Sequence, residues 1–234
     1  MAGYREHISV SGLCGICYGT SATLAFGFTP LQGALAGVLT WVAGMLPDLD
    51  SETGKPVREV FGLVAAIAPF AMMGHLMKWG GSAEGAIFLA IVLYALIRYG
   101  AATVLGKISV HRGMFHSIPA LAIAAELAYL GYKNDAISVK LLMAGGVALG
   151  FLSHLVLDEM YSVEWSGVRV RLKKSAGSAL KLTGKQFLPN VVTYATLMFL
   201  TYATLVDLGV LEGPEPTSLP EPIRQALEVE PQRF

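Results

Sequence analysis

Charged residues are scarce in this chain of 234 residues: only 15% are Asp, Glu, Lys or Arg, whereas 54% are hydrophobic. This composition excludes an ordinary soluble domain and favours a membrane protein. The 17 basic residues balance the 17 acidic residues, so the net charge is zero and gives no reason to expect a nucleic-acid partner. We therefore expect membrane lipids to be the main partners of the chain.

Cysteine is also rare, and both cysteines lie in the sequence CGIC at residues 14–17. A redox CxxC motif is typical of a βαβ unit with access to solvent, and the surrounding apolar sequence predicts neither. Small side chains at this spacing share one face of a helix, where they favour close packing. We therefore interpret Cys14 and Cys17 as packing residues rather than as a redox or metal site.

Long apolar stretches, by contrast, run through most of the chain. A helix that crosses the hydrocarbon core of a bilayer needs roughly 17 to 25 apolar residues, and we expect about seven such segments. The predicted fold class is therefore all-α, a polytopic membrane helix bundle. The domain is predicted to cover residues 1–211, followed by a tail rich in Pro and Glu at residues 212–234. The expected segments are residues 8–28, 31–47, 58–77, 85–105, 117–132, 141–157 and 188–211.

Basic residues gather between the last two expected segments, where residues 169–185 contain six Lys or Arg. Loops rich in Lys and Arg stay on the cytoplasmic side of an inner membrane, which predicts a multi-pass inner-membrane protein with this loop in the cytoplasm. Alternating crossings then place the N-terminus and the loops around residues 47–50 and 106–113 on the same cytoplasmic side. An alternative role for the basic loop is to bind anionic lipid headgroups.

Histidine is limited to five residues, and four of them fall at the predicted cytoplasmic ends of segments together with three aspartates. Burying a His or a carboxylate beside lipid costs on the order of 2 to 3 kcal/mol, so a shared position at one face indicates a shared site. We predict metal ligation by this set. Its members are His7, Asp48, Asp50, His111, His116, His154 and Asp158.

The spacing within the set suits ligation. His154 and Asp158 are four residues apart, so on a helix they lie on the same face. Asp48 and Asp50 follow Pro47, which ends a helix, and we expect an extended turn in which both carboxylates point the same way.

Two other histidines of the set, His111 and His116, are five residues apart, which does not fit one helical face. We expect His111 in a loop and His116 at the start of the next helix. Ser117 is then placed to cap that helix, and Pro119 is tolerated in its first turn.

Mixed His and Asp ligands favour zinc, with manganese or iron as alternatives, and bridging carboxylates allow two or more ions. A metal in such a site can acidify bound water near neutral pH, and Arg112 is placed to hold a phosphoryl or carboxylate group. Taken singly, an interfacial His is more often a structural residue, and an Asp after Pro is more often a turn former. The prediction therefore depends on the whole set.

Three sequence blocks resemble those of a known family: GMLPDLD at residues 44–50, VHRGMFHS at 110–117 and GFLSHLVLDEMYS at 150–162. They are similar to the signature blocks of the YdjM-like (DUF457) inner-membrane metal-dependent hydrolases, and His7 matches an early histidine of that family. The chain departs from many relatives at Ser51 and Glu52, where they have His-Pro. The resemblance implies a membrane enzyme distantly similar to zinc-dependent phospholipase C and P1 nuclease. It also implies the seven ligands named above, with Arg112 as the substrate holder.

The leading functional hypothesis is a metal-dependent hydrolase that cleaves a phosphoester, such as that of a phospholipid, at the cytoplasmic headgroup level. Arg112 would stabilise phosphoryl oxygens, and Asp48, Asp50 or Asp158 would orient or deprotonate water, with their individual roles left open. A divalent-metal transporter is an alternative, although its ligands are expected near the membrane midplane. A third reading is a structural membrane protein whose helices are joined by a metal.

Four polar residues lie away from the predicted site. Arg98 and Glu126 fall inside consecutive apolar segments, and we hypothesise an ion pair between them that positions the second segment. His75 and Asp207 are expected near the opposite membrane face.

Overall fold

The computed structural model describes residues 3–50, 55–101, 114–165, 170–172, 180–184 and 186–213. These residues are almost entirely helical, which confirms the predicted all-α class. An antiparallel hairpin of β1 (Val163–Trp165) and β2 (Val170–Leu172) follows the longest helix. The helical elements are α1 (Tyr4–Phe26), α2 (Pro30–Ala43), the 3₁₀ turn η1 (Pro47–Asp50), α3 (Lys55–Ala71), α4 (Met73–Gly80), α5 (Ala83–Ala95), the π-helical η2 (Leu96–Ala101), α7 (Ile118–Gly131), α8 (Ile137–Met160) and α9 (Phe187–Asp207).

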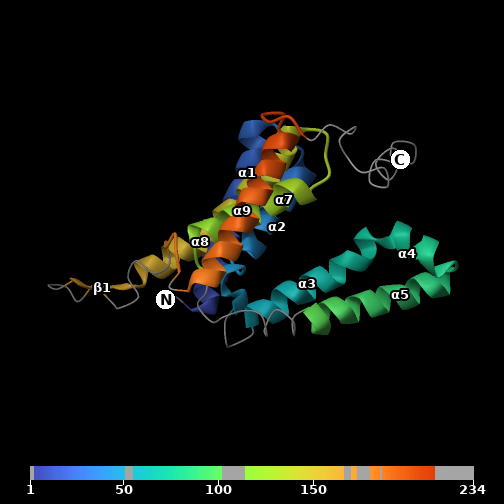
Figure 1. Ribbon diagram of the computed structural model, residues 1–234, viewed down its shortest axis with the longest axis horizontal. Helices are drawn as coiled ribbons and strands as arrows, with labels where there is room; N and C mark the ends of the chain where they lie inside the picture. The colour runs from blue at the N-terminus through green and yellow to red at the C-terminus, as the bar shows by residue number, and fades with distance from the viewer. Residues whose placement is uncertain are drawn as a thin grey trace.

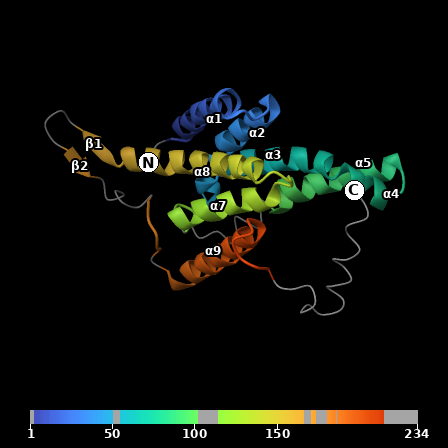
Figure 2. The ribbon, with the colours of Figure 1, turned by 90° about the horizontal axis from the view of Figure 1, so that it is seen from above.

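Helices α1, α2, α7, α8 and α9 pack into a bundle, and α3, α4 and α5 project from it as an arm (Figures 1 and 2). Helix α8 is the central member of the bundle, because it contacts α1, α2 and α7. In the most apolar 18-residue stretch of α8, 56% of the stretch is buried, compared with 22% of the corresponding stretch of α1 and 6% of that of α9. The core of the bundle therefore lies around α8, and α9 reaches it through α7.

The arm is a helical hairpin in which α3 packs against α5 and η2. Outside the arm, α3 contacts η1, the turn that follows α2. A bend of 63° separates α3 from α4. Pro69 lies inside the last turn of α3, where it cannot donate a backbone hydrogen bond and so favours a break.

Within the described residues, four helices are long and apolar enough to cross a bilayer, and the bent α3 and α4 pair makes a fifth candidate. Helices α2 and α7 have 14 residues each, a rise of about 21 Å against roughly 30 Å of hydrocarbon. Each of the expected segments coincides with a helix or a helix pair. The membrane class is therefore supported by these helices, while the count of about seven spans stays a prediction.

Glycines make the closest contacts between α1, α2 and α8. A Cβ atom placed on Gly15 would lie 2.4 Å from the carbonyl oxygen of Gly37, and one on Gly150 would lie 1.9 Å from that of Thr40. Cys17 is exposed, so the glycines beside the cysteines form the contact, and the interpretation of Cys17 as a packing residue is wrong. This close approach of three helices brings their ends together at one end of the bundle.

The prediction of an ion pair between Arg98 and Glu126 is wrong. The guanidinium group of Arg98 donates to the carbonyl oxygen of Arg58 inside the arm. Glu126 instead accepts a hydrogen bond from the hydroxyl of Thr201 on α9, with 2.7 Å between the oxygens. The pair does not form because the arm that carries Arg98 projects away from the bundle, whereas α9 packs on α7 (Figure 2).

A polar cluster outside the predicted metal site joins α7, α8 and α9, and no local sequence pattern indicates it. The hydroxyl of Tyr129 donates to Oδ2 of Asp207 at 2.7 Å, and the ammonium group of Lys140 contacts the same oxygen. The Lys140 nitrogen also lies 4.3 Å from the centre of the Tyr129 ring, within the range of a cation–π interaction. Asp207 is therefore a partner of buried groups and not only an interfacial residue.

Candidate metal centre

Five of the seven predicted ligands meet at one end of the bundle. They come from the first turn of α1, from η1, from the turn before α7 and from the last turns of α8. His111 and Arg112 lie outside the described residues, and so does the side chain of Asp50. The five residues that meet are His7, Asp48, His116, His154 and Asp158.

Helix α8 supplies two of these side chains. His154 and Asp158 are one turn apart, and Nε2 of His154 lies 3.7 Å from Oδ2 of Asp158. Their side chains are 0% and 2% exposed, so both polar groups are fully removed from solvent. A buried carboxylate beside a buried imidazole is costly unless a proton or another cation lies between them.

A backbone carbonyl determines which nitrogen of His154 faces the cluster. Nδ1 of His154 lies 2.7 Å from the carbonyl oxygen of Gly44, and because a carbonyl only accepts, Nδ1 must carry the proton. In the neutral imidazole, Nε2 then presents a lone pair toward Oδ1 of Asp48 at 3.6 Å and Oδ2 of Asp158 at 3.7 Å. No hydrogen-bond partner for this Nε2 occurs among the described residues. A shared cation would stabilise this arrangement, and the carbonyl is the kind of outer partner that orients metal-binding histidines.

The position of Gly44 depends on its lack of a side chain. A Cβ atom at Gly44 would lie 2.3 Å from Cβ of Ser11 on α1, which is completely buried. The hydroxyl of Ser11 donates to the carbonyl oxygen of Trp41 at 3.1 Å, which ties α1 to the end of α2. Gly44, the first residue of the GMLPDLD block, therefore supports the candidate site through its backbone, a role that no local sequence pattern indicates.

The sequence PDLD forms a 3₁₀ turn, so the expectation of an extended turn is wrong. The backbone nitrogen of Leu49 donates to the carbonyl oxygen of Leu46 at 3.2 Å, which closes this turn. Asp48 lies 3.3 Å from His116, measured between Oδ1 and Nε2. Burial opposes ionisation of Asp48, but the hydrogen bond from His116 favours the ionised carboxylate and outweighs it, so the pKa of Asp48 is below the ordinary value.

The turn at residues 114–117 positions His116. Ser117 caps α7 by accepting a hydrogen bond from the backbone nitrogen of Ala120 at 3.2 Å, and Pro119 lies in the first turn. Both features were predicted and are confirmed. His116 is buried, with Nε2 at 3.9 Å from Oδ2 of Asp158 in addition to its contact with Asp48.

Atoms that could bind a metal ion fall into two overlapping groups of three residues that share His154: His7, His154 and Asp158, and Asp48, His116 and His154. Nε2 of His154 lies 3.6 Å from Oδ1 of Asp48 and 3.7 Å from Oδ2 of Asp158, and Nε2 of His116 lies 3.3 Å and 3.9 Å from the same two oxygens. Metal–ligand distances of about 2.0–2.2 Å in a tetrahedral zinc site correspond to separations of roughly 3.3–3.6 Å between ligands. The described His and Asp side chains therefore could hold a metal ion, and two of these separations fall within this range.

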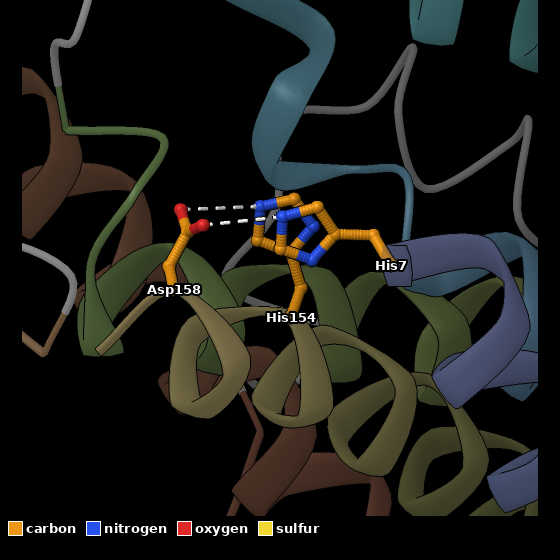
Figure 3. A group of neighbouring side chains, drawn as sticks. All are labelled: His7, His154 and Asp158. Atoms are coloured by element: carbon orange, nitrogen blue, oxygen red, sulfur yellow. Dashed lines mark hydrogen bonds and ion pairs between the residues drawn. The ribbon is translucent and has the colours of Figure 1, made fainter. Parts of the chain in front are cut away.

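His7 contacts both residues of the cluster that come from α8. Its ring stacks on that of His154, with centroids 3.6 Å apart and planes at 9°, as Figure 3 shows. Its Nε2 lies 3.1 Å from Oδ1 of Asp158, a hydrogen bond that leaves Oδ2 directed at the other donors. His7 thus holds the carboxylate of Asp158 in place from α1.

Comparison with known proteins assigns the chain to a family. Residues 1–172 match the YdjM inner membrane protein family. The chain belongs to this family. The YdjM match covers about three quarters of the sequence and includes all the residues of the candidate metal centre, which confirms the resemblance predicted from the three sequence blocks. No curated protein and no solved structure gives a significant match. Similarity to zinc-dependent phospholipase C and P1 nuclease stays a prediction.

Proposed function

We propose that this YdjM protein is a metal-dependent hydrolase of the inner membrane, and that it cleaves a phosphoester of a phospholipid at the cytoplasmic headgroup level. The supporting observation is the cluster of buried or half-buried His and Asp side chains at one end of the bundle, which forms two overlapping groups that could hold a metal ion. Family membership and several apolar helices support the membrane setting. The basic residues at 169–185 support the cytoplasmic orientation.

The proposed reaction needs residues for three roles: metal binding, activation of water and binding of the phosphoryl group. His116, His154 and Asp158 would hold the metal, because their side chains are at most 6% exposed. A zinc ion held there would act as a Lewis acid and would lower the pKa of bound water to about 7. Asp48 has a side chain that is 24% exposed, so it can contact both the metal and an entering substrate, and we assign it the role of orienting or deprotonating water. Arg112, which follows His111 in the VHRGMFHS block, would bind phosphoryl oxygens.

The position of the cluster favours hydrolysis over transport. A transporter for divalent metals is expected to bind its cargo near the membrane midplane, on broken helices. Here the metal-binding side chains come from η1, from the turn before α7 and from the last turns of α8, at one end of the bundle. A purely structural metal is the remaining rival, because four protein ligands can close a tetrahedral zinc site.

Metal content and turnover, measured together, test the proposal. The purified full-length protein is expected to contain zinc and to hydrolyse a chromogenic phosphodiester or phospholipid vesicles. His154→Ala and Asp158→Ala are expected to lose both properties. His75→Ala and Asp135→Ala are matched controls, because both residues are exposed and lie outside the cluster. Zinc uptake into sealed vesicles without hydrolysis would instead establish the transporter.

Asp48 separates the catalytic role from the structural one. If three buried donors hold the ion, Asp48→Asn is expected to retain zinc but to lose at least about tenfold in turnover. A structural site would behave differently, because removing one of four ligands would release the metal. Zinc-loaded wild-type protein that hydrolyses no phosphoester in a broad substrate screen would contradict the proposal.

A further inference from the structure

The turn that carries His116 contacts a segment from the far end of the chain, residues 180–184. The backbone nitrogen of Ile118, the first residue of α7, donates to the carbonyl oxygen of Lys181 at 3.2 Å. Backbone nitrogens in the first turn of a helix have no partner within the helix, so an outside acceptor fixes where the helix begins. The segment thus holds the start of α7 two residues after His116.

Helix α9 holds this segment in turn. Asn190 makes a reciprocal pair with Gly184, in which its oxygen accepts from the Gly184 nitrogen at 2.7 Å and its amide donates to the Gly184 carbonyl at 2.8 Å. The hydroxyl of Tyr194 donates to the carbonyl oxygen of Leu182 at 2.8 Å. Three hydrogen bonds from two side chains of α9 therefore fix a five-residue segment.

Residues 180–184 also contact Met114, which lies two residues before His116 in the sequence. A Cβ atom at Gly184 would lie 3.2 Å from the sulfur of Met114, so Gly184 lies against this buried side chain. The carbonyl oxygen of Met114 also accepts from the hydroxyl of Ser117. His116 is thus flanked by Met114 and Ile118, and both neighbours contact residues 180–184.

The contacts of residues 180–184 affect the metal centre only by fixing where the His116 side chain lies. Nε2 of His116 lies 3.3 Å and 3.9 Å from the carboxylates of Asp48 and Asp158, and a site held within about 0.5 Å of its working geometry loses affinity when its support is loosened. Asn190 and Tyr194 themselves are not among the donors of the cluster.

We infer that Asn190 and Tyr194 are positioning residues for His116, which act through residues 180–184. Helix α9 lies beyond residues 1–172, the part that matches the YdjM family, so the frame of the metal centre extends past the matched part. This inference relies on the metal centre of the proposed function, but not on hydrolysis.

Zinc affinity of the purified full-length protein tests the inference. The metal-free protein is titrated with zinc in competition with a chromogenic chelator. Asn190→Ala is expected to raise the zinc Kd roughly tenfold and Tyr194→Phe a smaller amount, the size typical of outer-shell changes. Tyr202→Phe is the matched control, because Tyr202 is an exposed tyrosine on the same helix, and its Kd is expected to equal that of the wild type.

A double-mutant cycle with His116→Ala distinguishes positioning from a general effect on folding. Without the His116 ring, Asn190→Ala is expected to cause no further loss of zinc affinity, whereas a general structural defect would add its full effect. Additive losses, or variants that bind zinc as tightly as the wild type, would overturn the inference while leaving the metal centre intact. A wild-type protein that binds no zinc would overturn the metal centre as well.

Discussion

The carbonyl oxygen of Gly44 accepts the Nδ1 proton of His154 across 110 positions of the sequence, with 2.7 Å between the two atoms. The end of α2 therefore determines which nitrogen of His154 faces the cluster. The two carboxylates nearest that nitrogen come from η1 and α8, so the orientation of one ring connects three elements.

Gly44→Ala is expected to weaken zinc binding roughly tenfold, because the carbonyl that orients His154 would move. The new methyl group would lie 2.3 Å from Cβ of Ser11 and 2.5 Å from its hydroxyl oxygen. Competitive zinc titration measures the effect. In a Ser11→Gly background the methyl group has room, so the same substitution is expected to cause a much smaller loss. An equal loss in both backgrounds would mean that the contact with Ser11 is not the cause.

Gly150→Ala is expected to destabilise the bundle by about 1–3 kcal/mol, because it would overpack α2 against α8. Its Cβ would lie 1.9 Å from the backbone oxygen of Thr40, which cannot rotate away as a side chain can. Unfolding in detergent, followed by circular dichroism, measures the change. Gly131→Ala is the control, since no atom lies within 4 Å of the added Cβ, and it is expected to be neutral or slightly stabilising.

Part of the site was predictable because local spacing in a helix is fixed. The period of the α-helix puts His154 and Asp158 on one face wherever α8 lies, and the capping role of Ser117 follows from the residues around it. The topology argument went further, since it grouped residues from distant segments at one membrane face, and the structure brings together five of the seven. The family was also recognisable from three short blocks.

The features that could not be predicted depend on how helices approach one another. No local pattern says that the Gly44 carbonyl meets His154, since that contact requires the close packing of Ser11 against Gly44. The expected pair of Arg98 and Glu126 rests on segments that are adjacent in sequence, but Arg98 lies on η2 in the arm, and Glu126 bonds to α9 instead. Sequence adjacency is a weak guide when every helix is apolar on several faces.

The cluster of Lys140 and Asp207 is expected to show strong coupling. Asp207→Leu leaves the buried ammonium group of Lys140 without its carboxylate, which is costly, whereas Lys140→Met removes the charge. The double variant is therefore expected to be more stable than Asp207→Leu alone, with a coupling energy of about 0.5–3 kcal/mol. Unfolding of the wild type, both single variants and the double variant in detergent gives this value. Simple additivity would show that the ion pair contributes little.

Zinc is expected to stabilise the wild-type protein against heat. An ion that binds only the folded state adds about 2.7 kcal/mol when its concentration is 100 times the Kd. The melting temperature of Asp158→Ala is expected to respond little to zinc, because Asp158 contacts both His154 and His116 in the cluster. Magnesium is a suitable control, since it prefers oxygen ligands in octahedral geometry and should produce a smaller shift.

His7→Phe distinguishes a ligand from a residue that holds a ligand. The phenyl ring can keep the stacking on His154, where the imidazole now lies at 3.6 Å, but it cannot donate to Oδ1 of Asp158. If the role of His7 is to hold Asp158, zinc affinity is expected to fall roughly tenfold with no change in the number of ions bound. His154→Phe, by comparison, is expected to abolish binding. Loss of one bound ion in His7→Phe, measured by metal analysis at saturating zinc, would instead assign His7 as a ligand, as the family resemblance implies.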